Sequence, residues 1–253
     1  FFASRWLIGT EFYFNFFICG VIGVLTSVAF VYITQYYTEY TYRPVKSIAE
    51  ASQTGPATNI IAGVAVGMES TGYPILVIGT AIVSAYYLGT HSGLNEGGLF
   101  GTAVATMGML GTAAYILAMD TFGPITDNAG GIVEMSQQSE EVRKRTDRLD
   151  SVGNTTKALT KGYAVGSAAL AAFLLFGAYI DEVRNYMPTF QPVINLNKPE
   201  VFVGAMLGSV LVYLFSSLAI KAVGKAAYAI INNVREQFKN NPGIMKGTSK
   251  PDY

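Results

Sequence analysis

FYFNFFICGVIGVLTSVAFVYIT, residues 12–34, is an apolar stretch that contains no charged side chain. A helix needs about 20 predominantly apolar residues to cross a bilayer, so this stretch is long enough to span a membrane. Comparable stretches recur along the chain. We predict five crossings, at about residues 12–34, 59–88, 97–122, 156–180 and 201–220.

Two of these crossings contain residues that interrupt a straight helix. Residues 59–88 are too long for one straight crossing and contain Glu69-Ser-Thr-Gly72 and then Pro74, so we expect a kink or an interfacial turn there. Gly123-Pro124 follows the third crossing and is expected to bend it. The sequence therefore predicts an all-α, polytopic membrane helical bundle.

The composition agrees with a membrane protein. Hydrophobic residues make up 51% of the 253 residues and charged residues 13%, against roughly 25% charged in soluble domains. The formal net charge is zero, which excludes the basic surface of a nucleic-acid-binding protein. Cys19 and His91 are the only residues of their kinds, so neither a disulfide framework nor a cysteine zinc cluster can form. The chain starts at Phe1, and we expect it to be a piece of a longer polypeptide.

Basic residues indicate which ends of the crossings face the cytosol. Twelve of the seventeen follow crossings one, three and five, and three lie on the opposite side. By the positive-inside rule, the cytosolic segments are about residues 35–58, 126–153 and 221–253. The last of these begins with an amphipathic pattern that we expect to continue the fifth helix into the cytosol.

Acidic residues mark the cytosolic end of the third crossing. Asp120, Asp127 and Glu134 are spaced by seven residues, which is nearly two helical turns, so they share one face if the helix continues through Pro124. Charge at the mouth of a membrane helix is costly and suggests a functional site.

The fourth crossing begins with a matching polar stripe. Asn154, Lys157 and Lys161 lie at positions i, i+3 and i+7, on one face of a helix. Because few residues separate the two stripes, we expect the helices to be antiparallel neighbours. Carboxylate and amide oxygens facing ammonium groups suit a magnesium–phosphate ligand.

A purely structural interpretation of the same residues is also open. Residues 127–131, DNAGG, can form a turn that ends a helix, and Asn154 can cap the start of the next one. Lys157 and Lys161 can extend to lipid headgroups. The run Arg143-Lys144-Arg145 is typical of a solvated charged face.

Three long strings in this region resemble signatures of the membrane-integral, ion-pumping pyrophosphatases. Residues 123–135, GPITDNAGGIVEM, are similar to that family's GPISDNAGGIAEM. Residues 142–150, VRKRTDRLD, resemble VRxRTDxLD, and residues 153–170, GNTTKALTKGYAVGSAAL, resemble GNTTxAxxKGxAIGSAAL. The order and spacing agree, and weaker similarity extends to both ends of the chain.

The resemblance implies a sixteen-helix homodimeric pump, of which this chain supplies helices nine to thirteen. Such pumps hydrolyse inorganic pyrophosphate at the cytosolic face with several Mg²⁺ ions and move protons or sodium ions across a plasma membrane or an acidic organelle membrane. The paired-aspartate segment and the final Asp/Lys segments of the family are absent here. The isolated chain is therefore expected to be inactive, and it contains no complete catalytic set.

Individual roles follow from the resemblance residue by residue. Asp127 matches a metal-binding aspartate and Asn154 an active-site asparagine, with Lys157 lining the same site. Lysine at position 157, together with Thr160, is typical of potassium-independent, proton-pumping members, where the ammonium occupies the place of a potassium ion. Leu175 matches a residue that constricts the ion path.

Asp120, Glu134 and Lys161 are candidate supporting charges around this site. Two alternatives from other classes remain. A non-hydrolytic secondary transporter or ion-channel segment explains the broken helix but not the signature strings. A scaffold explains the small-residue crossings and leaves the acidic and basic stripes without a use.

Overall fold

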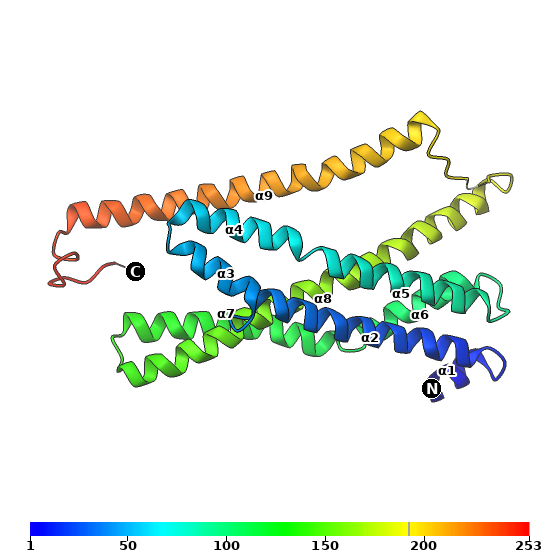
Figure 1. Ribbon diagram of the computed structural model, residues 1–253, viewed down its shortest axis with the longest axis horizontal. Helices are drawn as coiled ribbons and strands as arrows, with labels where there is room; N and C mark the ends of the chain where they lie inside the picture. Colours follow the sequence, from blue (N-terminus) through cyan, green and yellow to red (C-terminus); the bar gives the residue numbers. More distant parts are fainter. Residues whose placement is uncertain (192, 253) are drawn as a thin grey trace. The chain divides into compact units, whose positions relative to one another are not determined.

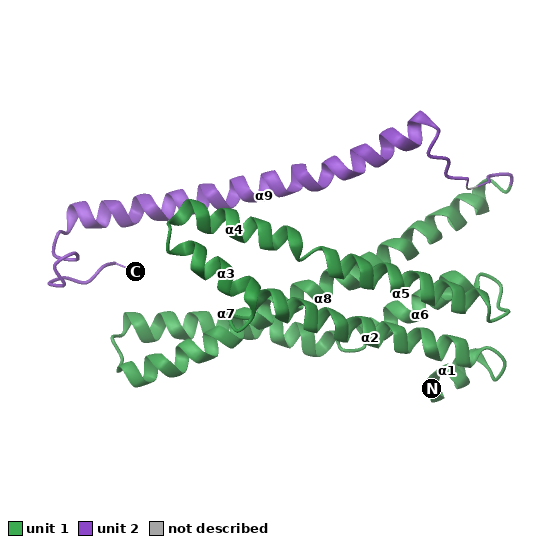
Figure 2. Ribbon diagram, in the orientation of Figure 1, with its two compact units in different colours: residues 1–188 green, residues 189–253 purple. Residues whose placement is uncertain are grey.

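A computed structural model describes residues 1–191 and 193–252, and every regular element in those residues is a helix (Figure 1). The chain divides into two compact units, Phe1–Pro188 and Thr189–Tyr253 (Figure 2). The first unit contains α1 (Phe2–Ile8), α2 (Tyr13–Thr38), α3 (Arg43–Ser52), α4 (Pro56–Glu69), α5 (Gly72–Thr90), α6 (Gly97–Leu110), α7 (Ala113–Met135) and α8 (Glu140–Tyr186). The second contains α9 (Pro199–Asn240). The prediction of an all-α membrane bundle is confirmed.

Several of the helices are long and apolar enough to cross a membrane. Among the described residues there are four by length and composition, or up to five if the bent pair α6–α7 is one span. The fifth predicted crossing lies in α9, which runs without a break to Asn240. The amphipathic segment that follows this crossing therefore continues the same helix, as its pattern predicts.

The core of the first unit lies where α2, α5, α6 and α8 pack against one another (Figure 1). Its largest fully buried side chains include Phe16, Phe30, Met109 and Leu170. Between these side chains the helices approach each other closely at glycines. A Cβ atom on Gly23 would lie 1.8 Å from the carbonyl oxygen of Ala105, so α2 and α6 are in backbone contact there.

This contact predicts a large effect of one added methyl group. Gly23→Ala should destabilise the protein by about 1–3 kcal/mol, because the atoms that the methyl group meets belong to the backbone and cannot rotate away. Gly63→Ala is the matched control, since a Cβ there meets nothing within 4 Å. Thermal unfolding in detergent compares the two variants, and equal midpoints would show that α2 and α6 can separate at little cost.

The interruption predicted in the second crossing is present. α4 ends at Glu69 and α5 begins at Gly72. At the end of α2 the hydroxyl of Tyr37 donates a hydrogen bond to Glu69, with Oη and Oε1 3.3 Å apart, so α4 extends beyond the end of α2. The 19 residues of α5 form a helix about 28 Å long, which matches the roughly 30 Å hydrocarbon core of a bilayer.

The helix continues through Gly123-Pro124, as the shared face of the acidic residues requires: α7 runs through Pro124 without interruption. A bend that was not predicted lies earlier, where the chain turns by 44° between α6 and α7. The hydroxyl of Tyr163 on α8 donates a 2.7 Å hydrogen bond to the carbonyl oxygen of Met109, near the end of α6. This contact from a distant helix compensates the loss of intrahelical partners where α6 ends, while α7 packs against α8.

Candidate active site

α7 and the first half of α8 form an antiparallel helical hairpin (Figure 1). α7 continues to Met135 and α8 begins at Glu140. Two elements of the structural interpretation are therefore wrong. Residues 127–131 do not end a helix, and Asn154 lies well inside α8 rather than at its N-cap. The polar stripes project from two continuous helices.

Two glycines bring the helices of the hairpin together. Gly123 and Gly153 are both buried. A Cβ on Gly153 would lie 2.0 Å from Oγ1 of Thr126, and a Cβ on Gly123 would lie 2.9 Å from the carbonyl oxygen of Gly153. No larger side chain fits between the helices at this level, so the polar side chains beside the glycines come within contact distance.

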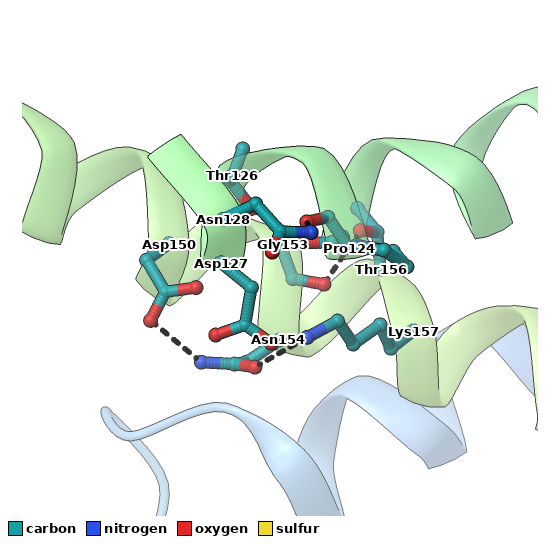
Figure 3. Close-up of polar contacts among 10 residues, drawn as sticks. Pro124, Thr126, Asp127, Asn128, Asp150, Gly153, Asn154, Thr156 and Lys157 are labelled. Carbon is teal, nitrogen blue, oxygen red and sulfur yellow. Dashed lines mark hydrogen bonds and ion pairs between the residues drawn. The ribbon is translucent and has the colours of Figure 1, made fainter. Parts of the chain in front are cut away.

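Four polar residues make continuous contacts beside this glycine pair, and we call them the Asp127 cluster (Figure 3). The ammonium group of Lys157 on α8 forms an ion pair with the carboxylate of Asp127 on α7. Nζ of Lys157 lies 3.3 Å from Oδ1 of Asn154. Nδ2 of Asn154 in turn lies 3.1 Å from Oδ2 of Asp150. The predicted neighbours Asp127, Asn154 and Lys157 therefore meet.

The electrostatics of the cluster favour a charged carboxylate at Asp127, which lies beyond the crossing predicted for residues 97–122. A hydrogen bond from Lys157, together with its positive charge, lowers the pKa of Asp127 below its ordinary value. Because the folded-state pKa is lowered, the ion pair is fully formed at neutral pH and is lost as the pH falls through that lowered pKa.

The other two acidic residues of α7 also contact α8. Asp120 accepts a 2.8 Å hydrogen bond from the hydroxyl of Thr160, and Glu134 lies 3.3 Å from Arg143. All three acids therefore face the same neighbouring helix, as their spacing of seven predicts. Elsewhere in the basic run, exposed ion pairs within α8 join Lys144 to Glu140 and Arg145 to Glu141, which fits a solvated helix surface.

Two further candidates lie outside the Asp127 cluster. Lys161 lines a cavity of ≈ 330 Å³ together with Asp120 and Thr160, and it forms no ion pair with the residues that the structure describes. Leu175 lies further along α8 and is 71% exposed. The structure brings neither of them into contact with the cluster.

Asp150 is the member of the cluster that the sequence-based selection missed. It closes the charged segment 142–150, which looks like a solvated surface when it is considered alone. One sequence feature could have identified Asp150: it lies four residues before Asn154, and residues four apart on a helix are neighbours. Its Oδ1 atom is buried and has no hydrogen-bond partner within residues 1–191 and 193–252.

The donor set of the cluster suits a magnesium–phosphate ligand only in part. The described residues contain no group of three or more His, Cys, Asp or Glu side chains placed to hold a metal ion. Mg²⁺, however, is commonly bound by one or two carboxylates together with substrate phosphates. Asp127 is half-exposed and supplies hard oxygen atoms, and Lys157 next to it supplies a positive charge for phosphate.

Comparison with known proteins agrees with these signatures. The family model of the inorganic H⁺ pyrophosphatases matches residues 1–253. The chain is 68% identical over 92% of its length to the K⁺-insensitive pyrophosphate-energized proton pump 2 of Moorella thermoacetica, and covers 34% of that protein. It is 58% identical over 99% of its length to the pyrophosphate-energized membrane proton pump 3 of Arabidopsis thaliana, and covers 32% of it.

A third relative with a similar name also matches most of the chain. The K⁺-insensitive pyrophosphate-energized proton pump of Caldanaerobacter subterraneus is 62% identical over 92% of the chain, which covers 34% of that protein. The chain thus spans about a third of the length of the curated relatives that it matches. Because the family model covers all 253 residues, the chain belongs to the inorganic H⁺ pyrophosphatase family.

Proposed function

We propose that the complete protein containing this chain hydrolyses inorganic pyrophosphate and uses the released energy to move protons across a membrane. The observation that carries the proposal is the Asp127 cluster, in which the two family signatures on α7 and α8 supply residues that contact each other. The relatives named as pyrophosphate-energized proton pumps support the same activity. The isolated chain, which spans about a third of the length of these relatives, is proposed to be inactive.

In this proposal the hairpin of α7 and α8 contributes one wall of a cytosolic substrate site. Asp127 binds Mg²⁺ through its carboxylate, and Asn154 presents its amide oxygen to the same region. When it is bound, Mg²⁺ polarises the phosphoryl oxygens and orients the attacking water. The ammonium of Lys157 neutralises part of the charge of pyrophosphate.

Potassium independence is assigned to Lys157 and Thr160. Lys157 carries a fixed positive charge at the place where a potassium-dependent enzyme needs a mobile one. Thr160 lies one helical turn further along α8 and donates its hydroxyl to Asp120. Two relatives named K⁺-insensitive support this subtype.

The remaining candidates have supporting roles in the proposal. Asp120, Glu134 and Lys161 supply charge around the substrate site, and Leu175 narrows the ion path below it. The complete protein is proposed to be a homodimer in a prokaryotic plasma membrane or in the membrane of an acidic eukaryotic organelle. The ends of α7 and α8 that meet at residues 135–140 face the cytosol, as the basic residues predict.

Reconstitution of the complete protein in liposomes tests the proposal. Addition of pyrophosphate and Mg²⁺ should release phosphate and acidify the lumen, at the same rate in sodium and in potassium buffers. A proton ionophore should abolish the acidification but not the hydrolysis. Hydrolysis that depends on added K⁺ would contradict the subtype, and the absence of hydrolysis would contradict the proposed function as a whole.

The same experiment separates the alternatives. A secondary transporter would move an ion or solute down an applied gradient without consuming pyrophosphate. A scaffold would do neither. The contacts of the Asp127 cluster favour the hydrolase, because they place a carboxylate, an amide and an ammonium group at one half-exposed site.

A further inference from the structure

The orientation of the Asn154 amide in the Asp127 cluster is fixed from both sides. A side-chain amide has a donating end and an accepting end. The end that faces Asp150 lies 3.1 Å from a carboxylate oxygen, and the end that faces Lys157 lies 3.3 Å from an ammonium nitrogen. A carboxylate only accepts hydrogen bonds and an ammonium group only donates them.

Rotation of the amide by half a turn would break both contacts. It would place a carbonyl oxygen against the carboxylate of Asp150 and an N–H group against the ammonium of Lys157. Of the two residues that set this orientation, Lys157 is already assigned to the substrate site. Asp150 has no role in the proposed function, and its second oxygen, Oδ1, is buried.

We propose that Asp150 is a positioning residue that holds the carbonyl oxygen of Asn154 toward Lys157 and the substrate site. This inference rests on the proposed function. Asp150 acts through Asn154 in this inference: its carboxylate accepts the amide N–H, and the amide oxygen is thereby presented to cations. The carboxyl group of Asp150 also lies beside that of Asp127, so the test must separate the contact with Asn154 from this second one. Outer-shell groups of this kind typically change metal affinity or activity by about 10- to 100-fold when they are removed.

The complete protein in membranes provides the test, with two readouts for each variant. One is pyrophosphate turnover as a function of Mg²⁺ concentration. The other is the thermal stabilisation produced by Mg²⁺ with imidodiphosphate, a pyrophosphate analogue that is not hydrolysed. Asp150→Ala should lower turnover by about 10- to 100-fold and raise the half-saturating Mg²⁺ concentration. Asp150→Asn should retain most of the activity, because its amide oxygen can accept the same hydrogen bond.

A double-mutant cycle shows whether Asp150 acts through Asn154. Asp150→Ala should have no further effect in the Asn154→Ala background, since residues that act as one unit are not additive. If Asn154→Ala turns over too slowly to measure, the thermal stabilisation by Mg²⁺ with imidodiphosphate is compared among the same variants instead. Asp147→Ala is the matched control, because it removes an exposed carboxylate from the preceding turn of α8.

The outcomes are distinct. If the losses of turnover in Asp150→Ala and Asn154→Ala simply add in the double variant, the inference is overturned. Equal losses of turnover in Asp150→Ala and Asp150→Asn would also overturn it, because they would show that the charge of Asp150 is needed. Unchanged turnover in Asp150→Ala would also overturn it. If the unmodified protein neither hydrolyses pyrophosphate nor is stabilised by imidodiphosphate, the proposed function fails instead.

Discussion

Replacement of Asp127 by asparagine in the complete pump should lower Mg²⁺-dependent pyrophosphate hydrolysis by about two to three orders of magnitude, the loss expected when one group that stabilises transition-state charge is removed. The substitution preserves the size of the side chain and leaves α7 intact. It removes the charged oxygen that pairs with Lys157 and that we assign to Mg²⁺. Phosphate release at saturating Mg²⁺ is the measurement.

A matched carboxylate on the same hairpin provides the control for this result. Asp147→Asn makes the same chemical change at an exposed position on α8, where the carboxylate lies 4.0 Å from Arg143. It should leave turnover close to that of the unmodified pump. Normal turnover in Asp127→Asn would remove Asp127 from the site, and equal losses in the two variants would point to a general effect of charge.

Lys157→Ala should convert the pump to dependence on added potassium. Without K⁺, hydrolysis should fall by about 100- to 1,000-fold, because the carboxylate of Asp127 and the amide oxygen of Asn154 lose the cation between them. A potassium ion can then occupy the vacated space and restore part of the activity. Turnover is measured over a range of K⁺ concentrations at constant ionic strength.

Lys144→Ala is the matched control for this experiment. Lys144 is an exposed lysine on the same helix, and in residues 1–191 and 193–252 its ion pair is with Glu140, so its removal should change neither the rate nor the response to K⁺. Two results would contradict the assignment of Lys157. One is a K⁺-free rate equal to that of the unmodified pump, and the other is a loss that K⁺ does not reverse.

Local sequence patterns predicted the helices and the meeting of Asp127 with Lys157. Both follow from periodicity, because helical spacing fixes which residues share a face and a short connection makes two helices neighbours. The interruption between α4 and α5 was visible for a similar reason, since Glu69 to Pro74 contains residues that disfavour an apolar helix.

The position of the bend near α7 could not be predicted in this way. Gly123-Pro124 disfavours a continuous helix locally, yet α7 remains helical there, with Gly123 packed against Gly153. The 44° bend lies between α6 and α7, about two helical turns before Asp120, and no proline is found there. Near this point the hydroxyl of Tyr163 on α8 donates a hydrogen bond to the backbone of α6. At both positions the backbone contacts a residue that is far away in sequence, and a local pattern does not show such contacts.

Asp150 was missed for a related reason. Its segment is dense in charge, and most of these side chains pair within their own helix in solvent. Only the packing of α7 against α8 shows that one carboxylate oxygen of this segment is buried. The spacing to Asn154 is present in the sequence, but nothing local distinguishes it from an ordinary surface pair.

The unbroken length of α8 has a mechanical consequence. Its 47 residues form a rod about 70 Å long, and Lys157 and Leu175 lie on it about 27 Å apart. A helix bends gently but does not change length, and α8 is unbroken between the two positions. Any axial displacement of the rod at residue 157 therefore arrives at residue 175 at the same time and with the same amplitude.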